Sequence, residues 1–232
     1  MSSNHHSRPA SRHRLRREQL RERFLANPPC LPDSELLELL LGYVLRGENK
    51  QLAKILLKRF GSLRAVLEAP AVELRESDGV TPALEAFWAI LRECEARLAE
   101  IPAATKLMPE DLDKVVHMAR RRLGGYRHEE MWAAFLDKQN HLLHWCCLSK
   151  GTGGRVFLPQ PEIIAKALEC NADGIILVHN HPGGNVMPSP QDIDFTTQLV
   201  HSGKLLELRV VDHLIITDEE YFSMRARNLL GN

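Results

Sequence analysis

Residues with metal-binding chemistry are concentrated in one short stretch, which contains His179, His181, Ser189 and Asp192. Neutral imidazole nitrogens and a carboxylate oxygen are good ligands for zinc-like ions. Residues i and i+2 of an extended backbone project to the same face, so both imidazoles can point the same way. The spacing therefore predicts a divalent metal held by His179, His181 and Asp192, with a fourth position open for water.

Ser189 and Asp192 also have a complete structural explanation. Ser189-Pro190-Gln191-Asp192 is typical of a helix N-terminus, with a serine N-cap, a proline in the first turn and a carboxylate that favours the helix dipole. A His-x-His pair alone is also weak evidence, because such pairs occur in loops without metal. The combination of two histidines and a following aspartate is what favours the metal site.

A hydrolytic metal site also needs a group that accepts a proton from the attacking water. Glu129 and Glu130 come directly before a strand expected at 131–136 and are the best-placed carboxylates. Side chains alternate along a strand, so only one of the two would face the site. In the competing interpretation both are solvated acids at the strand edge, and periodicity does not decide between these alternatives.

The elements that must position these residues fall into two regions. Apolar spacing predicts helices throughout residues 33–100. Further along, helices are expected at 110–123, 161–170 and 190–201, the last stopped by Gly203, and strands at 131–136, 142–148, 155–158, 174–178 and 208–217. The run at 174–178, GIILV, is typical of a strand buried on both faces. It leads directly into His179.

These patterns predict an α/β (α+β) protein with two domains and a tail. A basic tail is expected at 1–23, a small all-α domain at 24–102, and a mixed domain of strands and helices at 105–227. The chain has 232 residues, 44% of them hydrophobic, which is enough for two domains that each bury a core.

Charge is balanced overall but uneven along the chain. The formal net charge is zero, whereas residues 1–30 contain seven arginines and two glutamates. The basic stretch at 8–17 is expected to be a solvated, partly disordered tail that leads into a helix, or alternatively to contact nucleic-acid phosphates. Five cysteines without a C-x-x-C motif favour a reducing compartment. With no secretory apolar core and no apolar run of about 20 residues, we expect a cytoplasmic protein without membrane association.

The order His179-x-His181, seven residues, Ser189, two residues, Asp192 matches the JAMM metalloprotease signature. The segment from Val178 to Gly184 resembles the bacterial RadC branch in particular, and the likeness extends over nearly all of 105–227. This resemblance implies an MPN-type mixed sheet flanked by helices. It also implies one zinc ion on His179, His181 and Asp192.

The resemblance assigns roles to two further residues. Ser189 would stabilise the tetrahedral intermediate through a hydrogen bond. The segment Glu129-Glu130-Met131-Trp132 aligns best with Glu129 as the base, and an offset of one residue to Glu130 is the alternative. Characterised eukaryotic relatives cleave isopeptide bonds to ubiquitin, a substrate that bacteria generally lack. The reaction class is therefore expected to transfer better than the substrate.

The N-terminal helical region resembles the leading domain of the RadC family, which looks like a helix-hairpin-helix module. The DNA-contacting turn of such a module has two glycines, and Thr81 stands here in place of the second, after Gly79. A side chain there hinders close approach to a phosphate. We therefore expect a packing or partner-binding role for this region rather than DNA binding.

Three functions remain to be compared. The first is a zinc-dependent metallopeptidase or isopeptidase that acts on a peptide or protein substrate. The alternative is a DNA-associated accessory protein with a structural or vestigial metal site, which contacts nucleic acid through its arginine-rich tail. A metal-dependent nuclease or phosphoesterase is the third, and a single metal with little positive charge around the motif weighs against it. The sequence leaves the oligomeric state open.

Overall fold

A computed structural model describes residues 12–107, 111–151 and 159–231. Contacts within the chain divide it into two compact units, Met1–Arg92 and Glu93–Asn232. The strand expected at 155–158 lies outside the described residues. Among the helices that the structure does describe, none has the length and apolar character needed to cross a membrane.

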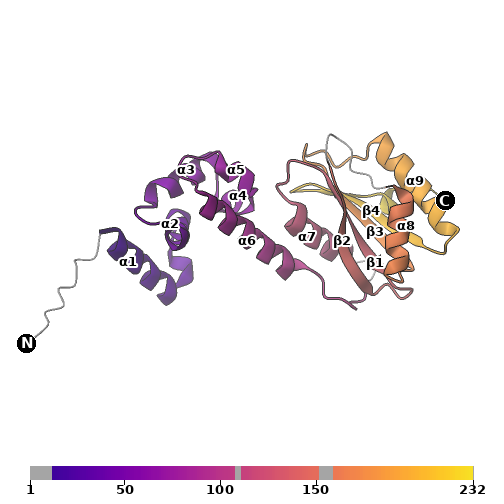
Figure 1. The fold of residues 1–232 in the computed structure, drawn as a ribbon, viewed down its shortest axis with the longest axis horizontal. Helices are drawn as coiled ribbons and strands as arrows, with labels where there is room; N and C mark the ends of the chain where they lie inside the picture. Colours follow the sequence, from indigo (N-terminus) through magenta and orange to yellow (C-terminus); the bar gives the residue numbers. More distant parts are fainter. Residues whose placement is uncertain (1–11, 108–110, 152–158, 232) are drawn as a thin grey trace, which may run out of the picture. The chain divides into compact units, whose positions relative to one another are not determined.

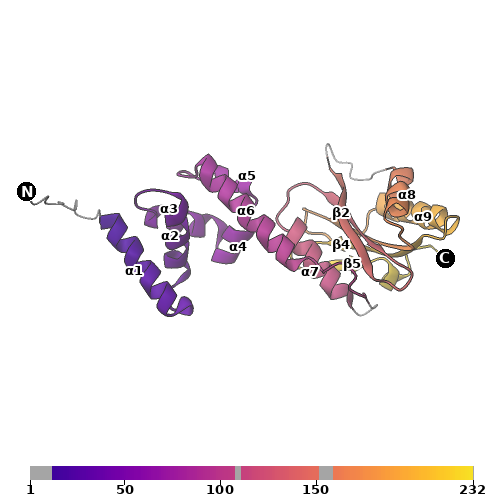
Figure 2. The ribbon, with the colours of Figure 1, turned by 60° about the horizontal axis from the view of Figure 1, so that its bottom comes forward.

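The first unit is helical, as expected (Figures 1 and 2). Its elements are α1 (Arg12–Ala26), η1 (Pro28–Cys30), α2 (Asp33–Val44), α3 (Lys50–Phe60), α4 (Leu63–Glu68), α5 (Ala71–Arg75) and α6 (Pro82–Ala99), the last of which crosses the division. Leu37, Leu56 and Trp88 are buried at its centre. The indole Nε1 of Trp88 donates a hydrogen bond to the carbonyl of Val66 at 2.9 Å, so this buried N–H has a partner.

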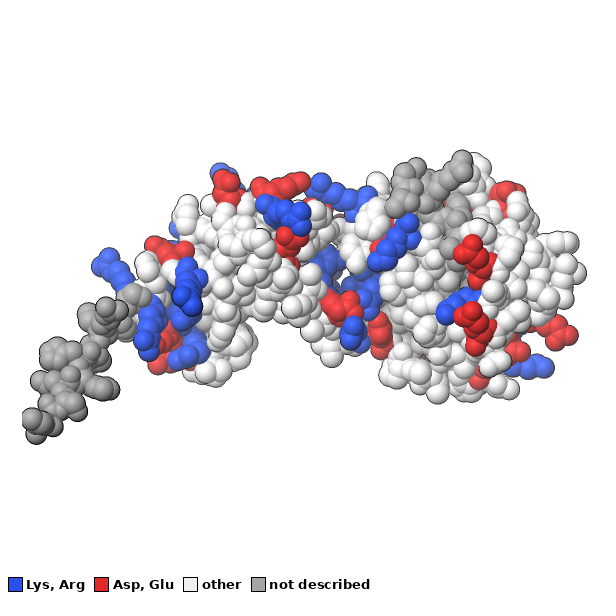
Figure 3. Space-filling model, in the orientation of Figure 1, with Lys and Arg blue, Asp and Glu red and all other residues white. Residues whose placement is uncertain are grey.

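Helix α1 begins at Arg12, so residues 12–23 of the segment expected as a basic tail are helical, and most of their side chains are exposed. Leu20 is only 1% exposed and packs against Leu31 and Leu39. Arg16 and Arg23 both pair with Glu35, at 2.9 and 2.8 Å. Figure 3 shows basic and acidic side chains interspersed over the N-terminal helices. Positions 16, 20 and 23 lie on one face of α1, and this narrow face packs against the following helices. The arginines that surround it make this face hard to recognise in the sequence.

The second unit contains a five-stranded mixed sheet with the order β2-β1-β3-β4-β5. The strands are β1 (Glu130–Leu136), β2 (Leu142–Lys150), β3 (Gly174–Asn180), β4 (Arg209–Ile216) and β5 (Tyr221–Ser223). Strands β3 and β4 are parallel, and the other neighbours are antiparallel. Helix α7 (Leu112–Leu123) covers one face of the sheet, and α8 (Gln160–Glu169) and α9 (Pro190–Lys204) cover the other (Figures 1 and 2). The predicted α/β fold is confirmed.

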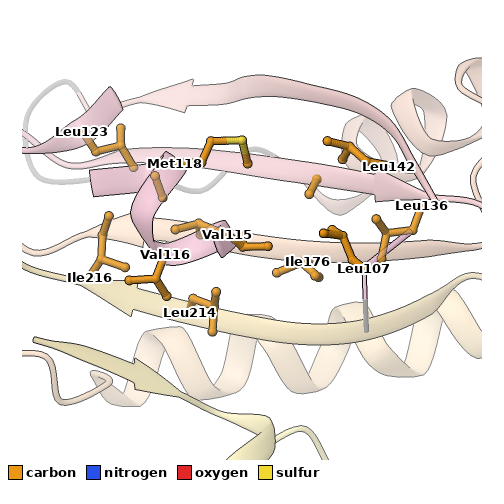
Figure 4. Close-up of a cluster of buried hydrophobic side chains, with 13 residues drawn as sticks. Leu107, Val115, Val116, Met118, Leu123, Leu136, Leu142, Ile176, Leu214 and Ile216 are labelled. Atoms are coloured by element: carbon orange, nitrogen blue, oxygen red, sulfur yellow. The ribbon is translucent and has the colours of Figure 1, made fainter. Parts of the chain in front are cut away.

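The two faces of the sheet bury alternate residues of β3. Ile176 and Val178 pack with Met118 of α7 in the cluster of Figure 4. Ile175 and Leu177 pack on the opposite face, against α8 and α9. This alternation places His179 on the α8/α9 face and the next residue on the α7 face. The end of β3 can therefore present a polar group to each side.

Gly203 lies inside α9 and does not stop the helix. A Cβ at this position would lie 2.6 Å from the carbonyl oxygen of Leu208, where the chain folds back against the helix. We expect Gly203→Ala to lower the free energy of unfolding by about 1–3 kcal/mol, because the backbone must shift. Denaturant titration measures this change.

Gly183→Ala is the matched control, since a Cβ at Gly183 would meet nothing within 4 Å. Its free energy of unfolding should stay within about 0.5 kcal/mol of the wild-type value. Equal destabilisation by both substitutions would show that the close approach at Leu208 does not determine the effect.

Candidate metal centre

The predicted ligands converge where β3 ends and α9 begins. His179 is the penultimate residue of β3, His181 follows the strand directly, and Asp192 lies in the first turn of α9. The Nε2 atoms of the two imidazoles are 2.9 Å apart. Asp192 Oδ1 lies 3.4 Å from Nε2 of His179, and Oδ2 lies 3.7 Å from Nε2 of His181. Within the described residues these three side chains form a group able to hold a metal ion.

The spacing of these atoms suits zinc. Zinc–ligand bonds of about 2.0–2.1 Å in a tetrahedron place neighbouring ligand atoms about 3.3 Å apart. The two Nε2 atoms are 2.9 Å apart, and each lies 3.4 or 3.7 Å from one of the two Asp192 carboxylate oxygens, so all three separations are close to this value. The donor set, two imidazole nitrogens and one carboxylate, is also typical of a catalytic zinc site with an open position. The residues present therefore fit the metal that the sequence predicts.

The protonation of His181 follows from its neighbour. Its Nδ1 lies 2.7 Å from the carbonyl oxygen of Asn185. A carbonyl oxygen can only accept, so Nδ1 carries the proton and donates it. In the neutral ring Nε2 is then a bare lone pair. That lone pair faces the other two ligand side chains.

Burial keeps His179 in the form that binds metal. Its side chain is 1% exposed, and this desolvation lowers its pKa to about 4, against the opposing charge of Asp192. The ring is therefore neutral at neutral pH, which is the state that a metal ligand requires. Its Nδ1 lies 2.7 Å from Nε2 of His213, whose pKa is also lowered by burial.

Ser189 and Asp192 form the helix cap that their sequence indicated. The backbone N–H of Asp192 donates to Ser189 Oγ at 3.1 Å, and the backbone N–H of Ser189 donates to Asp192 Oδ2 at 2.6 Å. This reciprocal pair holds the Asp192 carboxylate beside the imidazoles. Within the described residues, Ser189 Oγ acts as an acceptor in this cap. A catalytic role for Ser189 stays a prediction.

The two candidate bases lie in different surroundings. Glu130 is 2% exposed, and its carboxylate accepts from Trp132 Nε1 at 2.9 Å and lies 3.0 Å from His128 Nε2. Trp132 belongs to the α7 face. Met131 lies on the opposite face and is paired with His179. Glu129 lies one residue before β1, and the same alternation carried one residue further predicts that it faces the side of the candidate ligands; its role as the base stays a prediction.

Asn180 holds the backbone on both sides of Glu129. Its Oδ1 accepts from the N–H of Glu130 at 2.8 Å, and its Nδ2 donates to the carbonyl of His128 at 3.0 Å. This amide continues the β1–β3 pairing by one residue beyond the ladder, which begins at Met131 and His179. The side chain between the two histidine ligands thus fixes the segment that carries Glu129.

Three residues near the site were not singled out as functional from the sequence. Asn180 was seen only as the spacer between the histidines. His213 is buried, and its ring contacts the metal-ligand candidate His179. Thr196 lies one helical turn beyond Asp192 and contacts His213 at 2.6 Å. Only the parallel pairing of β3 with β4 brings His213 to this place.

Comparison with known proteins agrees with this fold. Residues 109–229 match the RadC-like JAB domain family. The chain is 35% identical over 215 residues to a UPF0758 protein of Neisseria gonorrhoeae, which covers 92% of this chain and 94% of the relative. It is also 35% identical over 216 residues to a UPF0758 protein of Ruegeria pomeroyi, which covers 92% and 96%.

The fold and the comparisons together define a JAB-domain protein. The chain belongs to the RadC family.

Proposed function

We propose that this chain is a zinc-dependent hydrolase of peptide or isopeptide bonds. The observation that carries the proposal is the meeting of two imidazole Nε2 atoms and a carboxylate at 2.9–3.7 Å. His181 Nε2 is a lone pair there, and a carboxylate is a further acceptor. Acceptors packed this closely repel one another unless a cation lies between them.

His179, His181 and Asp192 would hold the ion. Bound zinc would lower the pKa of a bound water molecule and polarise the carbonyl of the substrate. In this proposal the Glu129 carboxylate accepts the proton of the attacking water and returns it to the nitrogen of the leaving amine. The Ser189 hydroxyl donates a hydrogen bond to the oxygen that gains charge at the scissile carbonyl.

A DNA-associated function has less support among the described residues. Arg16 and Arg23 pair with Glu35, and Arg17 donates to the carbonyl of Gly42 at 2.7 Å. Thr81, which replaces a glycine of the helix-hairpin-helix turn, accepts from the backbone N–H of Leu84 at the start of α6. These groups already have structural partners, so the hydrolase is the better-supported proposal.

Zinc analysis together with a cleavage screen tests the proposal. After metal-replete expression we expect about one zinc ion per chain, as three protein ligands imply. The zinc-loaded chain should cleave members of a peptide library, detected by mass spectrometry, and chelation should stop the cleavage. A chain that stays free of zinc at micromolar metal would overturn the metal site. A zinc-loaded chain that cleaves neither peptide nor isopeptide-linked substrates would overturn the reaction.

A further inference from the structure

His213 and Thr196 connect two of the candidate metal ligands behind the site. His179 Nδ1 lies 2.7 Å from His213 Nε2, and His213 Nδ1 lies 2.6 Å from Thr196 Oγ1. Thr196 Oγ1 in turn donates to the backbone carbonyl of Asp192 at 2.6 Å. We call this series of bonds the histidine–threonine chain. It begins at one ligand side chain and ends on the backbone of another.

The side chains of the histidine–threonine chain are buried. Thr196 and His213 are both 0% exposed and His179 is 1% exposed. The carboxylate of Asp212, the neighbour of His213, accepts from the His213 backbone N–H at 2.7 Å, from Ser223 Oγ at 2.6 Å and from the backbone N–H of Arg225 at 3.0 Å. Solvent is excluded from His213, and both of its ring nitrogens have partners within the histidine–threonine chain.

The direction of each proton follows from the carbonyl at the end. A carbonyl oxygen only accepts, so the single hydroxyl proton of Thr196 points to Asp192. Thr196 Oγ1 must then accept from His213, which places the His213 proton on Nδ1. His213 Nε2 is left as an acceptor, and the bond to it comes from the Nδ1 proton of His179.

We propose that His213 and Thr196 are positioning residues that fix the tautomer of His179, keeping its Nε2 free of a proton for the metal. This inference rests on the proposed function, because it concerns the same ion. A ligand histidine usually donates its second nitrogen to a carboxylate, a backbone carbonyl or water. His181 follows that pattern through the carbonyl of Asn185. His179 instead donates to an imidazole whose own orientation is set by a threonine one turn beyond Asp192.

The same bonds exclude His213 as a ligand in its own right. Its Nε2 contacts His179 and its Nδ1 contacts Thr196, so neither nitrogen is available to an ion. Among the described residues, the acceptor of the His213 Nδ1 proton is the Thr196 hydroxyl oxygen. Removing that hydroxyl leaves the His213 Nδ1 proton buried without an acceptor, which favours the opposite tautomer. His213 would then donate to His179, and the proton of His179 would move to Nε2.

Thr196→Val tests this reasoning because it removes the hydroxyl and keeps the side-chain shape. Thr196→Ser is the matched control, since it keeps the hydroxyl. Zinc affinity, measured by competition with a chelator, should fall about 10–100-fold in the valine variant. It should stay within about threefold of wild type in the serine variant, which preserves each bond of the chain. Equal affinities for wild type and valine variant would overturn the proposal.

A second measurement needs no metal and no variant. Side-chain nitrogen NMR of the metal-free wild-type protein reports which ring nitrogen carries each proton. We expect His179 and His213 both to be protonated at Nδ1. A proton on His179 Nε2 would contradict the proposal. Failure of the wild-type protein to bind zinc would instead remove the proposed function and leave the tautomer result standing. The two failures are therefore distinguishable.

Discussion

Replacing His181 by alanine is expected to abolish zinc binding at micromolar metal while the chain stays folded. Altering only the hydrogen-bond partners of ligands typically costs 10–100-fold in metal affinity, so loss of a ligand should cost more than about 100-fold. The fold should survive because the His181 side chain is 16% exposed and makes its backbone-facing bond to Asn185 in a loop. Loss of that bond costs about 0.5–1.5 kcal/mol.

Calorimetric titration with zinc and thermal unfolding check this result together. Wild-type protein should gain about 2.7 kcal/mol of stability at zinc concentrations 100 times the dissociation constant, and the alanine variant should gain none. His201→Ala is the control, because His201 is exposed on α9 and outside the ligand group. Zinc binding by His181→Ala with wild-type affinity would show that this imidazole is not a ligand.

Glu129→Gln is expected to keep its zinc and lose its turnover. The amide cannot accept the proton that the proposed reaction delivers to Glu129, and such proton transfer contributes about 10²–10⁴-fold. The turnover number should fall by that factor while metal content stays at the wild-type level. Product formation from a substrate identified in the peptide screen, measured alongside zinc content, reports both quantities.

Glu130→Gln is the matched control at the neighbouring position. Its carboxylate is occupied by Trp132 and His128 on the α7 face, so the amide should change activity by less than about tenfold, well below the effect of removing a base. Some loss of stability is expected, since a buried charge-assisted bond is replaced by a neutral one. A larger fall in turnover for Glu130→Gln than for Glu129→Gln would reverse the assignment.

The grouping of His179, His181 and Asp192 could be predicted from the sequence because local geometry determines how their side chains approach one another. His179 and His181 leave the same strand, and the cap at Ser189 brings Asp192 to the start of a helix that packs on that strand. The strongly apolar run in β3 made its burial on both faces predictable. The short strand β5 was not predicted, because three residues carry too little pattern.

The contact between His213 and His179 could not be predicted, because it depends on the strand register and on which face of the sheet each residue occupies. His213 reaches His179 only because β4 pairs with β3 in the observed parallel register, and one residue of slip would turn it to the other face. The same alternation of faces predicts that Glu129 and Glu130 point to opposite sides of the sheet. The start of helix α1 at Arg12 was not predicted for a different reason, because Leu20 is its one buried residue and lies among arginines.

The reciprocal cap between Ser189 and Asp192 has a consequence for how the ion enters and leaves. Folding alone orders the acid side chain, because the backbone amide of Ser189 restrains it before any cation arrives. The vacant and loaded forms should therefore superimpose closely, so that exchange of the cation is governed by ligand bonds breaking and not by rearrangement of the chain. A polypeptide that had lost both histidines would still need this serine and this acid to begin its helix.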